Sequence, residues 1–288
     1  MTVSIIIVNY NGLEFTRQCL ETLYRYHDSQ MIEVIVVDNN STDGSQKDLP
    51  VLFPSITLIS LPENKGFGAA NNAGAAIAKG EFLFFVNNDT LFREEILSVM
   101  KTQILLNEKC GIVGPKLLNQ DQSFQLSFGS FPSLRTEMEA KQSAHNYSLQ
   151  SAQDIVSHLT IKKDWVTGAA FMIKRHLFEL VGGFDEHYFM YFEDIDLCKT
   201  VCEKGYHVLY VPQISLIHLG GKSYPKRDDK IVYEYRRSQL RYYDKHNSLF
   251  QRIAVRKYIG FKFFPKIFTK KGSGLAKKVL KLLFSSQH

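Results

Sequence analysis

Short apolar runs alternate with segments of helical periodicity through the N-terminal part of the chain. β-branched residues fill Val3 to Val8 and Glu33 to Val37 at strand length, and further strands are expected at Ile56 to Leu61 and Phe82 to Val86. Between the strands, helical spacing of apolar residues predicts two helices, the first with Leu13, Cys19, Leu20, Leu23 and Tyr24 and the second over Gly68 to Ala78. This alternation favours an α/β fold with a doubly wound, mostly parallel sheet.

Polar clusters follow three of these strands, at Asn9 to Asn11, Asp38 to Asp43 and Asn87 to Asp89. Ligands of parallel sheets bind outside the carboxyl ends of the strands, so we expect the functional site at this edge. The carboxylate of Asp89, beside two amide side chains, suits a hard cation that bridges diphosphate oxygens. A turn or helix cap is the alternative role for this residue.

A second acidic cluster, Glu193 to Asp196, follows the aromatic run Tyr188 to Tyr191. Burial against aromatic surfaces can tune the basicity of a carboxylate, and sugars stack on aromatic faces, so one of these acids is a candidate base for a hydroxyl proton. Alternatively, the acids occupy the first turn of a helix that leads to Lys204, where the helix dipole favours negative charge. Asp196 as a structural acid and Asp194 as a chemical one would satisfy both interpretations.

His218 follows the expected strand segments Val208 to Val211 and Ile214 to Ile217, and a glycine pair with a lysine comes next. This combination suits a metal-bound diphosphate, with a structural histidine as the alternative. The run from Gly66 to Asn71 is not interpreted as a dinucleotide fingerprint, because the third glycine is absent and the run follows the third strand rather than the first. Lys65 beside it is a candidate phosphate contact.

Charge is concentrated at the C-terminus. The net charge is +6, no acidic residue follows Asp244, and about ten Lys and Arg follow Phe250. A helical projection of Leu275 to Leu283 separates three lysines from an apolar arc of Leu275, Val279, Leu282 and Leu283. This pattern predicts a basic helix that docks on an anionic membrane surface, and a helix packed on the protein or a disordered tail is the alternative. No nucleic-acid motif accompanies the charge, so nucleic acid is not an expected partner.

No apolar stretch approaches the roughly 20 residues that a membrane-spanning helix needs. The sequence therefore predicts a cytoplasmic protein that attaches peripherally to the inner face of the cell membrane. Its four cysteines are scattered and are expected as reduced thiols.

Five segments together resemble family 2 glycosyltransferases, in order and spacing, and within that family the rhamnosyltransferase-like branch. The segments are Val3 to Asn11, Val36 to Gly44, Asn64 to Asn72, Asn87-Asn88-Asp89 and Glu193 to Leu197. The resemblance covers residues 1–245 and implies a GT-A fold. It divides the chain into a nucleotide-sugar-binding half (1–118), a polar insertion or mobile loop (119–160), an acceptor and catalytic half (161–245) and the basic tail (246–288).

The resemblance implies inverting transfer of a sugar, rhamnose or another hexose, to an acceptor hydroxyl in bacterial cell-envelope polysaccharide synthesis. The expected donor is a dTDP-, UDP- or GDP-sugar, the acceptor a glycan or a lipid-linked glycan, and the cofactor Mg²⁺ or Mn²⁺. By position, the donor-binding residues are Tyr10, Asp38, Asn39, Lys65, Asn72 and Asn88, the metal ligands are Asp89 and His218, the base is Asp194, and the acceptor pocket contains Trp165, Gly168 and Glu193. Asn87 replaces the first Asp of the metal motif, which leaves the cation one fewer charged ligand.

Two other functions remain open at this level. A non-catalytic module that binds nucleotide sugars or glycans is favoured by the missing first Asp, whereas Asp89 and Asp194 favour an enzyme. A sugar nucleotidyltransferase is expected to carry a glycine-rich, basic loop after its first strand, where this chain has Asn9-Tyr10-Asn11-Gly12.

Overall fold

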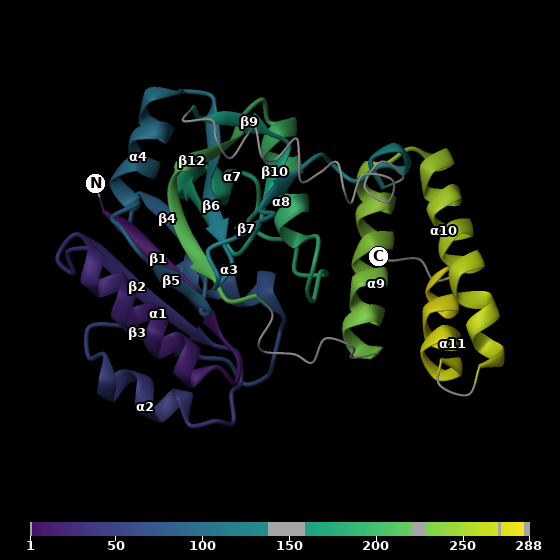
Figure 1. The fold of residues 1–288 in the computed structure, drawn as a ribbon, viewed down its shortest axis with the longest axis horizontal. Helices are drawn as coiled ribbons and strands as arrows, with labels where there is room; N and C mark the ends of the chain where they lie inside the picture. The colour runs from purple at the N-terminus through teal and green to yellow at the C-terminus, as the bar shows by residue number, and fades with distance from the viewer. Residues whose placement is uncertain (1, 138–158, 221–228, 270–271, 285–288) are drawn as a thin grey trace.

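The structure is a computed structural model that describes residues 2–137, 159–220, 229–269 and 272–284. An α/β domain occupies the N-terminal part, and the C-terminal helices stand beside it (Figure 1). The strands are β1 (Val3–Asn9), β2 (Ile32–Asp38), β3 (Thr57–Ser60), β4 (Phe82–Asn87), β5 (Thr90–Phe92), β6 (Cys110–Leu118), β7 (Phe124–Gln125), β8 (Phe128–Gly129), β9 (Ile161–Lys163), β10 (Trp165–Val166), β11 (Ala170–Lys174) and β12 (His207–His218). The helices are α1 (Leu13–Tyr26), α2 (Ser45–Leu52), α3 (Phe67–Ile77), α4 (Leu97–Leu106), α7 (Arg175–Leu180), α8 (Glu193–Glu203), α9 (Asp229–His246), α10 (Leu249–Phe263), the 3-10 helix η1 (Phe264–Phe268) and α11 (Ser273–Leu282).

The main sheet has the strand order β3-β2-β1-β4-β11-β6-β12-β5, with β7 paired to β6 and β9 to β12. The first four strands are parallel, as the sequence predicts. The second half is mixed, because β11 runs antiparallel to both of its neighbours while β6 and β12 are parallel. The expected α/β class is therefore confirmed, and the parallel arrangement belongs to its N-terminal half.

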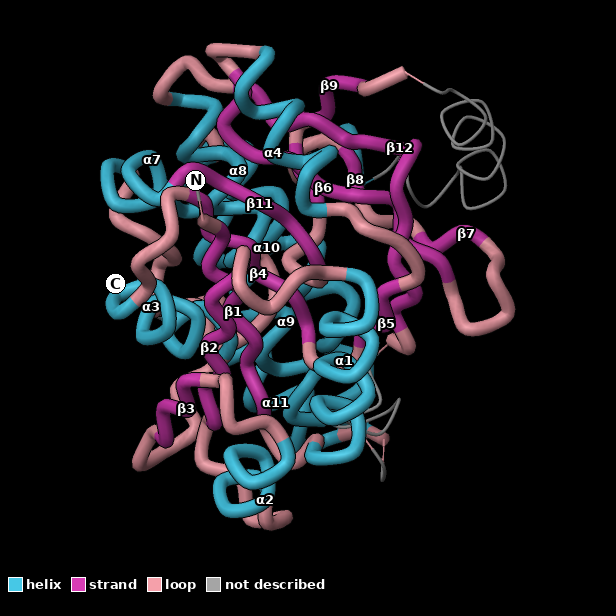
Figure 2. Tube along the Cα trace, turned by 90° about the vertical axis from the view of Figure 1, so that its left-hand side faces the viewer, coloured by secondary structure: helices cyan, strands magenta, loops and turns pink. Residues whose placement is uncertain are grey.

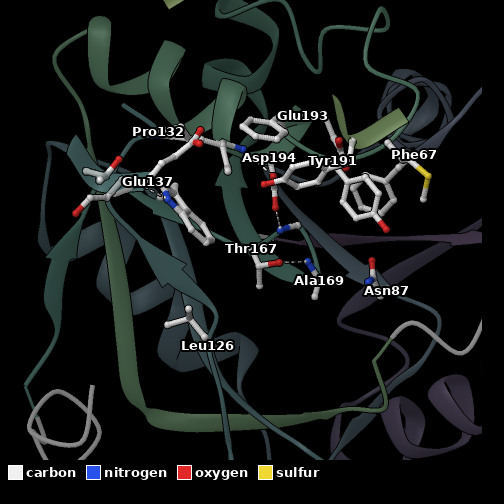
Figure 3. A pocket seen from close by; sticks show the side chains of 18 residues that line it. Phe67, Asn87, Leu126, Pro132, Glu137, Thr167, Ala169, Tyr191, Glu193 and Asp194 are labelled. Carbon is white, nitrogen blue, oxygen red and sulfur yellow. Dashed lines mark hydrogen bonds between the residues drawn. The ribbon is translucent and has the colours of Figure 1, made fainter. Parts of the chain in front are cut away.

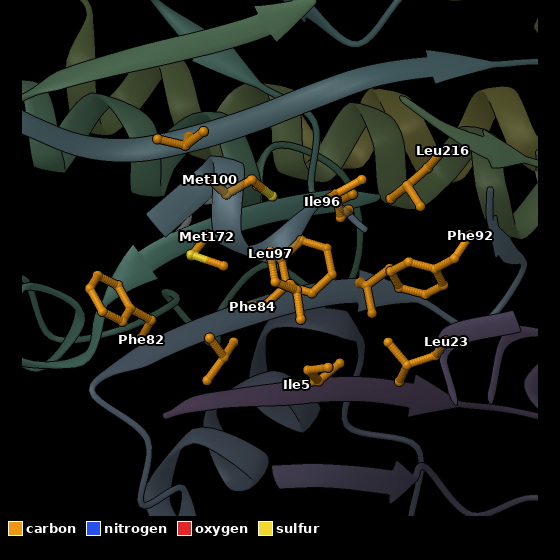
Figure 4. Packing of buried hydrophobic residues seen from close by; sticks show 14 of the residues in the cluster. Ile5, Leu23, Phe82, Phe84, Phe92, Ile96, Leu97, Met100, Met172 and Leu216 are labelled. Carbon is orange, nitrogen blue, oxygen red and sulfur yellow. The ribbon is translucent and has the colours of Figure 1, made fainter. Parts of the chain in front are cut away.

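Helices cover both faces of the sheet, which explains why its central strands are continuously apolar. On β1, Ile5 and Ile7 pack in a cluster with residues of α1 and α4, whereas Ile6 packs on the other face with residues of α3 and α8. Figure 4 shows the first cluster, and Figure 2 shows the strands passing between the helices.

The described part of the predicted polar insertion is ordered on the domain. Its residues 119–137 include β7 and β8, and Phe128 of β8 is buried in the core cluster that contains Tyr210. The remaining predicted insertion, apart from Leu159 and Thr160, lies outside the described residues. The two predicted strand segments before His218 form one strand, β12, with a register shift between Val211 and Ser215.

The C-terminal helices α9, α10 and α11 share one hydrophobic cluster, which also includes Tyr188 and Phe192 of the α/β domain. This packing corrects the predicted orientation of the basic helix. Val279 and Leu282 are 0% and 7% exposed, so the apolar arc that was expected to meet a membrane contacts the protein instead. Among the described helices, none is long and apolar enough to cross a membrane.

Candidate active site

Side chains at the carboxyl ends of β1, β2 and β4 meet, because these strands are parallel neighbours in the register Asn9↔Asp38 and Val8↔Asn87. Asn9 connects them: its Nδ2 donates to Oδ2 of Asp38 at 2.8 Å, and its Oδ1 accepts from Nδ2 of Asn88 at 3.2 Å. The three polar clusters therefore form one edge, as the sequence predicts.

Asp38 and Asn39 organise the loops of this edge. Asp38 is fully buried, and its Oδ1 accepts from the Ser41 main-chain N–H at 2.9 Å. Asn39 is 3% exposed, donates to the Gly66 carbonyl at 3.1 Å and accepts from the Lys65 N–H at 2.9 Å. Both predicted donor-binding residues thus fix the main chain of the loops at this edge.

The other four predicted donor-binding residues divide into two kinds. Tyr10 and Lys65 reach the surface at this edge, half-buried and exposed respectively. The amides of Asn72 and Asn88 are engaged inside the protein: Asn72 pairs with both main-chain groups of Phe184 at 2.9 Å, and Asn88 donates to Thr16 at 3.1 Å. A direct donor contact by these two amides stays a prediction.

Asp89 and His218 are brought together by the antiparallel pairing of β5 with the end of β12, in which His218 lies opposite Thr90. Oδ1 of Asp89 lies 3.1 Å from Nε2 of His218, and Nδ2 of Asn87 lies 3.2 Å from the same nitrogen. On its other side, Nδ1 of His218 lies 2.6 Å from Oε1 of Gln125. Since an amide oxygen only accepts, a proton on Nδ1 satisfies this bond and leaves the Nε2 lone pair directed at Asp89 and Asn87.

This donor set fits a divalent cation. A lone pair and a carboxylate oxygen that face each other at 3.1 Å are stabilised by a positive charge between them. Imidazole and carboxylate suit Mn²⁺, and Mg²⁺ accepts one or two carboxylates together with substrate phosphates. The described residues contain no group of three or more His, Cys, Asp or Glu side chains that could enclose an ion, so diphosphate oxygens would complete the coordination.

Asp194 lies in the first turn of α8, and the two residues before this helix have an unusual backbone conformation. Tyr191 and Phe192 both adopt left-handed backbone conformations, with φ of 68° and 69°, which is uncommon for bulky residues. Oδ2 of Asp194 accepts from the Gly168 N–H at 2.7 Å, and Oδ1 accepts from the Ile195 N–H at 2.8 Å. These bonds hold the carboxylate in a fixed orientation.

Burial changes the acidity of both carboxyls at this position. It raises the pKa of Asp194, although the N–H groups of Gly168 and Ile195 oppose the shift. It raises the pKa of Glu193 well above the usual range, with a second contribution from the negative charge of Asp194. Oε2 of Glu193 is buried and has no hydrogen-bond partner among the described residues. A carboxyl with a raised pKa is a stronger base once ionised.

One cavity of about 770 Å³ extends from the acidic residues of α8 to Asn87 at the end of β4 (Figure 3). Asp194, Glu193, Trp165 and Gly168 line it, and so does Asn87, which is hydrogen-bonded to His218. The loop before β11 bridges the two sides, because the Asn87 N–H donates to the Ala169 carbonyl at 2.9 Å. The predicted base and acceptor-pocket residues thus share a cavity with the neighbour of the predicted metal ligands.

The sequence pattern that defines Glycosyl transferase family 2 matches residues 4–196, which is more than half of the chain. The chain belongs to this family.

Relatives of this family 2 chain include three named rhamnosyltransferases. N-acetylglucosaminyl-diphospho-decaprenol L-rhamnosyltransferase of Mycobacterium tuberculosis is 27% identical over 203 residues, which cover 65% of this chain and 66% of the relative. Rhamnosyltransferase WbbL of Escherichia coli is 28% identical over 227 residues, or 75% of this chain and 83% of the relative. The dTDP-rhamnosyl transferase RfbF of Shigella flexneri is 27% identical over 223 residues, or 76% and 69%.

Solved structures confirm the GT-A fold. GalNAc-T7 with UDP, GalNAc and Mn²⁺ matches with a TM-score of 0.67 at 12% identity, over 98% of this chain and 56% of that one. The mannosyltransferase PcManGT of Pyrobaculum calidifontis, in complex with GDP-Man and Mn²⁺, matches with a TM-score of 0.58 at 18% identity, over 99% and 70%.

The sequence of this family 2 chain did not indicate several of the residues that line the cavity. Leu126, Ser130, Pro132, Thr136 and Glu137 come from the predicted insertion, and Tyr235 comes from α9. Gln125, which orients His218, belongs to the same insertion. Their segment has weak periodicity, so nothing in the sequence pattern distinguishes them from a surface loop.

Proposed function

We propose that this chain is an inverting glycosyltransferase that moves a sugar, rhamnose or another hexose, from a nucleoside diphosphate to a hydroxyl of a glycan or lipid-linked acceptor. The observation that carries the proposal is the shared cavity, with a buried carboxylate of raised pKa on one side and the pair Asp89 and His218 behind Asn87 on the other. The rhamnosyltransferase relatives support the choice of sugar, and the M. tuberculosis relative, named for a diphospho-decaprenol acceptor, supports a lipid-linked one.

In the proposed reaction, Asp194 accepts the proton of the acceptor hydroxyl. The hydroxyl oxygen then forms a bond to the anomeric carbon, while the bond from that carbon to the diphosphate oxygen breaks and its electrons leave with the diphosphate. Attack opposite to the leaving group inverts the anomeric centre. The N–H groups of Gly168 and Ile195 keep the carboxylate oriented for the transfer.

A divalent cation, Mg²⁺ or Mn²⁺, would be held by Asp89 and His218. When bound, it neutralises charge on the leaving diphosphate. Asn87 and Gln125 orient the imidazole, and Asn9, Asp38 and Asn39 shape the loops for the nucleoside. Trp165, Gly168 and Glu193 would face the acceptor.

We also propose that the protein works in the cytoplasm at the inner face of the membrane, where a lipid-linked acceptor is available. The basic C-terminal helices support this location, since no acidic residue follows Asp244. The face of α11 that the sequence suggested for this contact is packed against the protein, so another surface must make it.

Product analysis with a panel of dTDP-, UDP- and GDP-sugars tests the function, with acceptor, Mn²⁺ or Mg²⁺, and parallel samples in EDTA. The proposal predicts acceptor-dependent release of nucleoside diphosphate that EDTA suppresses. Release of pyrophosphate from a sugar phosphate and nucleoside triphosphate would instead identify a nucleotidyltransferase. Protection of the protein against thermal unfolding by a nucleotide sugar, without any product, would identify a binding module.

A further inference from the structure

A second cavity, of about 410 Å³, lies where α9 meets α10 and η1. Its charged lining is entirely basic: Arg236 from α9, Lys262 from α10 and Lys266 from η1. The other described lining residues are Tyr191, Ile231, Val232, Tyr235 and Phe263, so no carboxylate of the described chain lines the cavity. Three cations without an opposing acid favour an anionic ligand.

The basic groups are held around aromatic rings. The Arg236 guanidinium carbon lies 5.2 Å from the centre of the Tyr235 ring and 6.0 Å from that of Phe263. The Lys266 ammonium lies 4.9 Å from the same Phe263 ring. Nε of Arg236 is buried and has no hydrogen-bond partner among the described residues, although its NH1 donates to Gln239. A buried guanidinium donor without a partner is expected to bind an acceptor oxygen.

This cavity adjoins the candidate active site. Tyr191 and Tyr235 line both cavities, and their ring centres are 5.7 Å apart. Tyr191 comes three residues before Asp194. A molecule that presents a hydroxyl to Asp194 can therefore extend past the two tyrosines to the basic groups.

Beyond the cavity, η1 exposes large aromatic side chains. Phe264 is 58% exposed and Phe268 is 79% exposed, and Phe261 at the end of α10 is 80% exposed. Lys262 and Lys266 lie between them in the chain. Exposed aromatic residues next to lysines suit the boundary between lipid headgroups and acyl chains.

We propose that the cavity of Arg236, Lys262 and Lys266 binds the diphosphate of a sugar-diphospho-lipid acceptor. In this arrangement, which rests on the proposed function, the acceptor sugar lies in the larger cavity near Asp194, the diphosphate passes Tyr191 and Tyr235, and the lipid chain leaves along Phe264 and Phe268. The site is separate from the donor diphosphate position at Asp89. The class of acceptor thus follows from the positive charge of the cavity and from its position. The diphosphate would lie one sugar away from Asp194, and the lipid would follow it.

Binding of geranyl diphosphate, measured in EDTA without donor, tests the proposal independently of catalysis. The double variant Lys262→Gln/Lys266→Gln removes two exposed ammonium groups, and Arg236→Gln is measured separately because its side chain packs between two rings. We expect the double variant to raise the dissociation constant at least about tenfold, since charge-assisted bonds to phosphate are lost. Lys257→Gln, on the same helix but not lining the cavity, should bind as the wild type does.

Two further measurements distinguish the proposed site from the donor site and from a general attraction to anionic lipid. Asp89→Asn should leave geranyl diphosphate binding in EDTA unchanged; a change in affinity, tighter binding above all because a repelling carboxylate is removed, would place the probe at the donor site and overturn the proposal. Vesicles of phosphatidylglycerol distinguish a specific diphosphate site from general attraction to anionic lipid. If the double lysine variant loses vesicle binding but keeps wild-type affinity for geranyl diphosphate, the cavity does not bind the acceptor diphosphate.

Failure of this proposal and failure of the proposed function are separable. Absence of nucleoside diphosphate release by the wild type would contradict the glycosyltransferase function, whatever the lysines do. With transfer present, an unchanged KM of the double variant for a sugar-diphospho-geranyl acceptor would contradict the second site alone. We expect this KM to rise while the KM for the same sugar on an uncharged alkyl chain stays constant.

Discussion

Adjacent carboxyls at the start of α8 have different surroundings and are expected to have different protonation. Asp194 has two main-chain N–H partners at 2.7 and 2.8 Å, which favour its charged form. Glu193 is 7% exposed, and its pKa is raised well above the usual range by burial and by its charged neighbour. Burial raises the pKa of both carboxyls and raises that of Glu193 further, so Asp194 ionises more readily and is the better candidate for the base.

Glu193→Gln tests the protonation of Glu193 through stability. A carboxyl with a raised pKa stabilises the folded state below the usual range of glutamate, and this contribution is lost as pH rises through the raised value. We therefore expect the wild type to lose more unfolding free energy than Glu193→Gln between about pH 5 and about pH 8 in urea titrations. Glu179→Gln, at an exposed carboxyl, is the control. If the unfolding free energies of wild type and Glu193→Gln depend equally on pH, the pKa of Glu193 is not raised.

At the residue scale, the sequence indicated well which side chains gather at the site. It indicated less well which partners each of these side chains contacts. Asp38, Asn39, Asn87 and Asp89 lie at the expected edge because strand ends are readable from periodicity, whereas Asp194 was indicated by the acidic cluster at the start of α8. The inward direction of Asn72 and Asn88 depends on partners far away in the chain, Phe184 and Thr16. Such partners leave no local signal.

Ion pairs join α9 to the first turn of α8, the turn that contains Asp194, and to Asp185 before that helix. Asp196 is 2% exposed, and its carboxylate oxygens lie 2.8 Å from the Lys245 ammonium and 2.7 Å from Nε2 of His246. Asp185 binds Arg241 at 2.9 Å, which helps to hold its pKa below the usual range against the opposing effect of burial. Asp196 is thus the structural member of the acidic cluster, as one of the open interpretations suggested.

Asp196→Asn should destabilise the protein by about 2 kcal/mol, because it removes the charge of a buried carboxylate that contacts Lys245 and His246, while Lys245 keeps only its 3.1 Å pair with Asp185. The measurement is the free energy of unfolding in urea. Glu179→Gln breaks an exposed pair with Arg175 and should cost less than about 1 kcal/mol. Similar small losses for both variants would mean that α9 does not depend on this connection.

At the element scale, the helical periodicity of α11 was read correctly and its environment was not. Amphipathicity shows that one face is apolar but not what covers it. Here α9 and α10 supply the cover, through residues such as Leu240, Val255 and Ile259. These helices follow one another in the chain, but periodicity within one helix does not indicate which neighbour covers its apolar face.

At the scale of the whole molecule, the N-terminal half was the most predictable part, since its strands are short apolar runs and polar clusters follow three of them. The second half is harder, because β11 enters antiparallel and α9 contributes Tyr235 to the cavity from a segment for which the sequence predicted no site residue. The site itself exists only in the folded chain: β4, the loop before β11, α8 and β12 converge on it from separate parts of the sequence.

We propose that Asp194 acts on the acceptor, and that Asp89, whose partner His218 contacts Asn87 of the same cavity, acts on the donor diphosphate. The most direct measurement compares turnover and donor dissociation constants of Asp194→Asn and Asp89→Asn, with Mn²⁺ present. We predict that Asp194→Asn lowers kcat by a factor on the order of a hundred to ten thousand with unchanged donor affinity, and that Asp89→Asn weakens metal-dependent donor binding. Full turnover by Asp194→Asn, at unchanged donor affinity, would contradict the account.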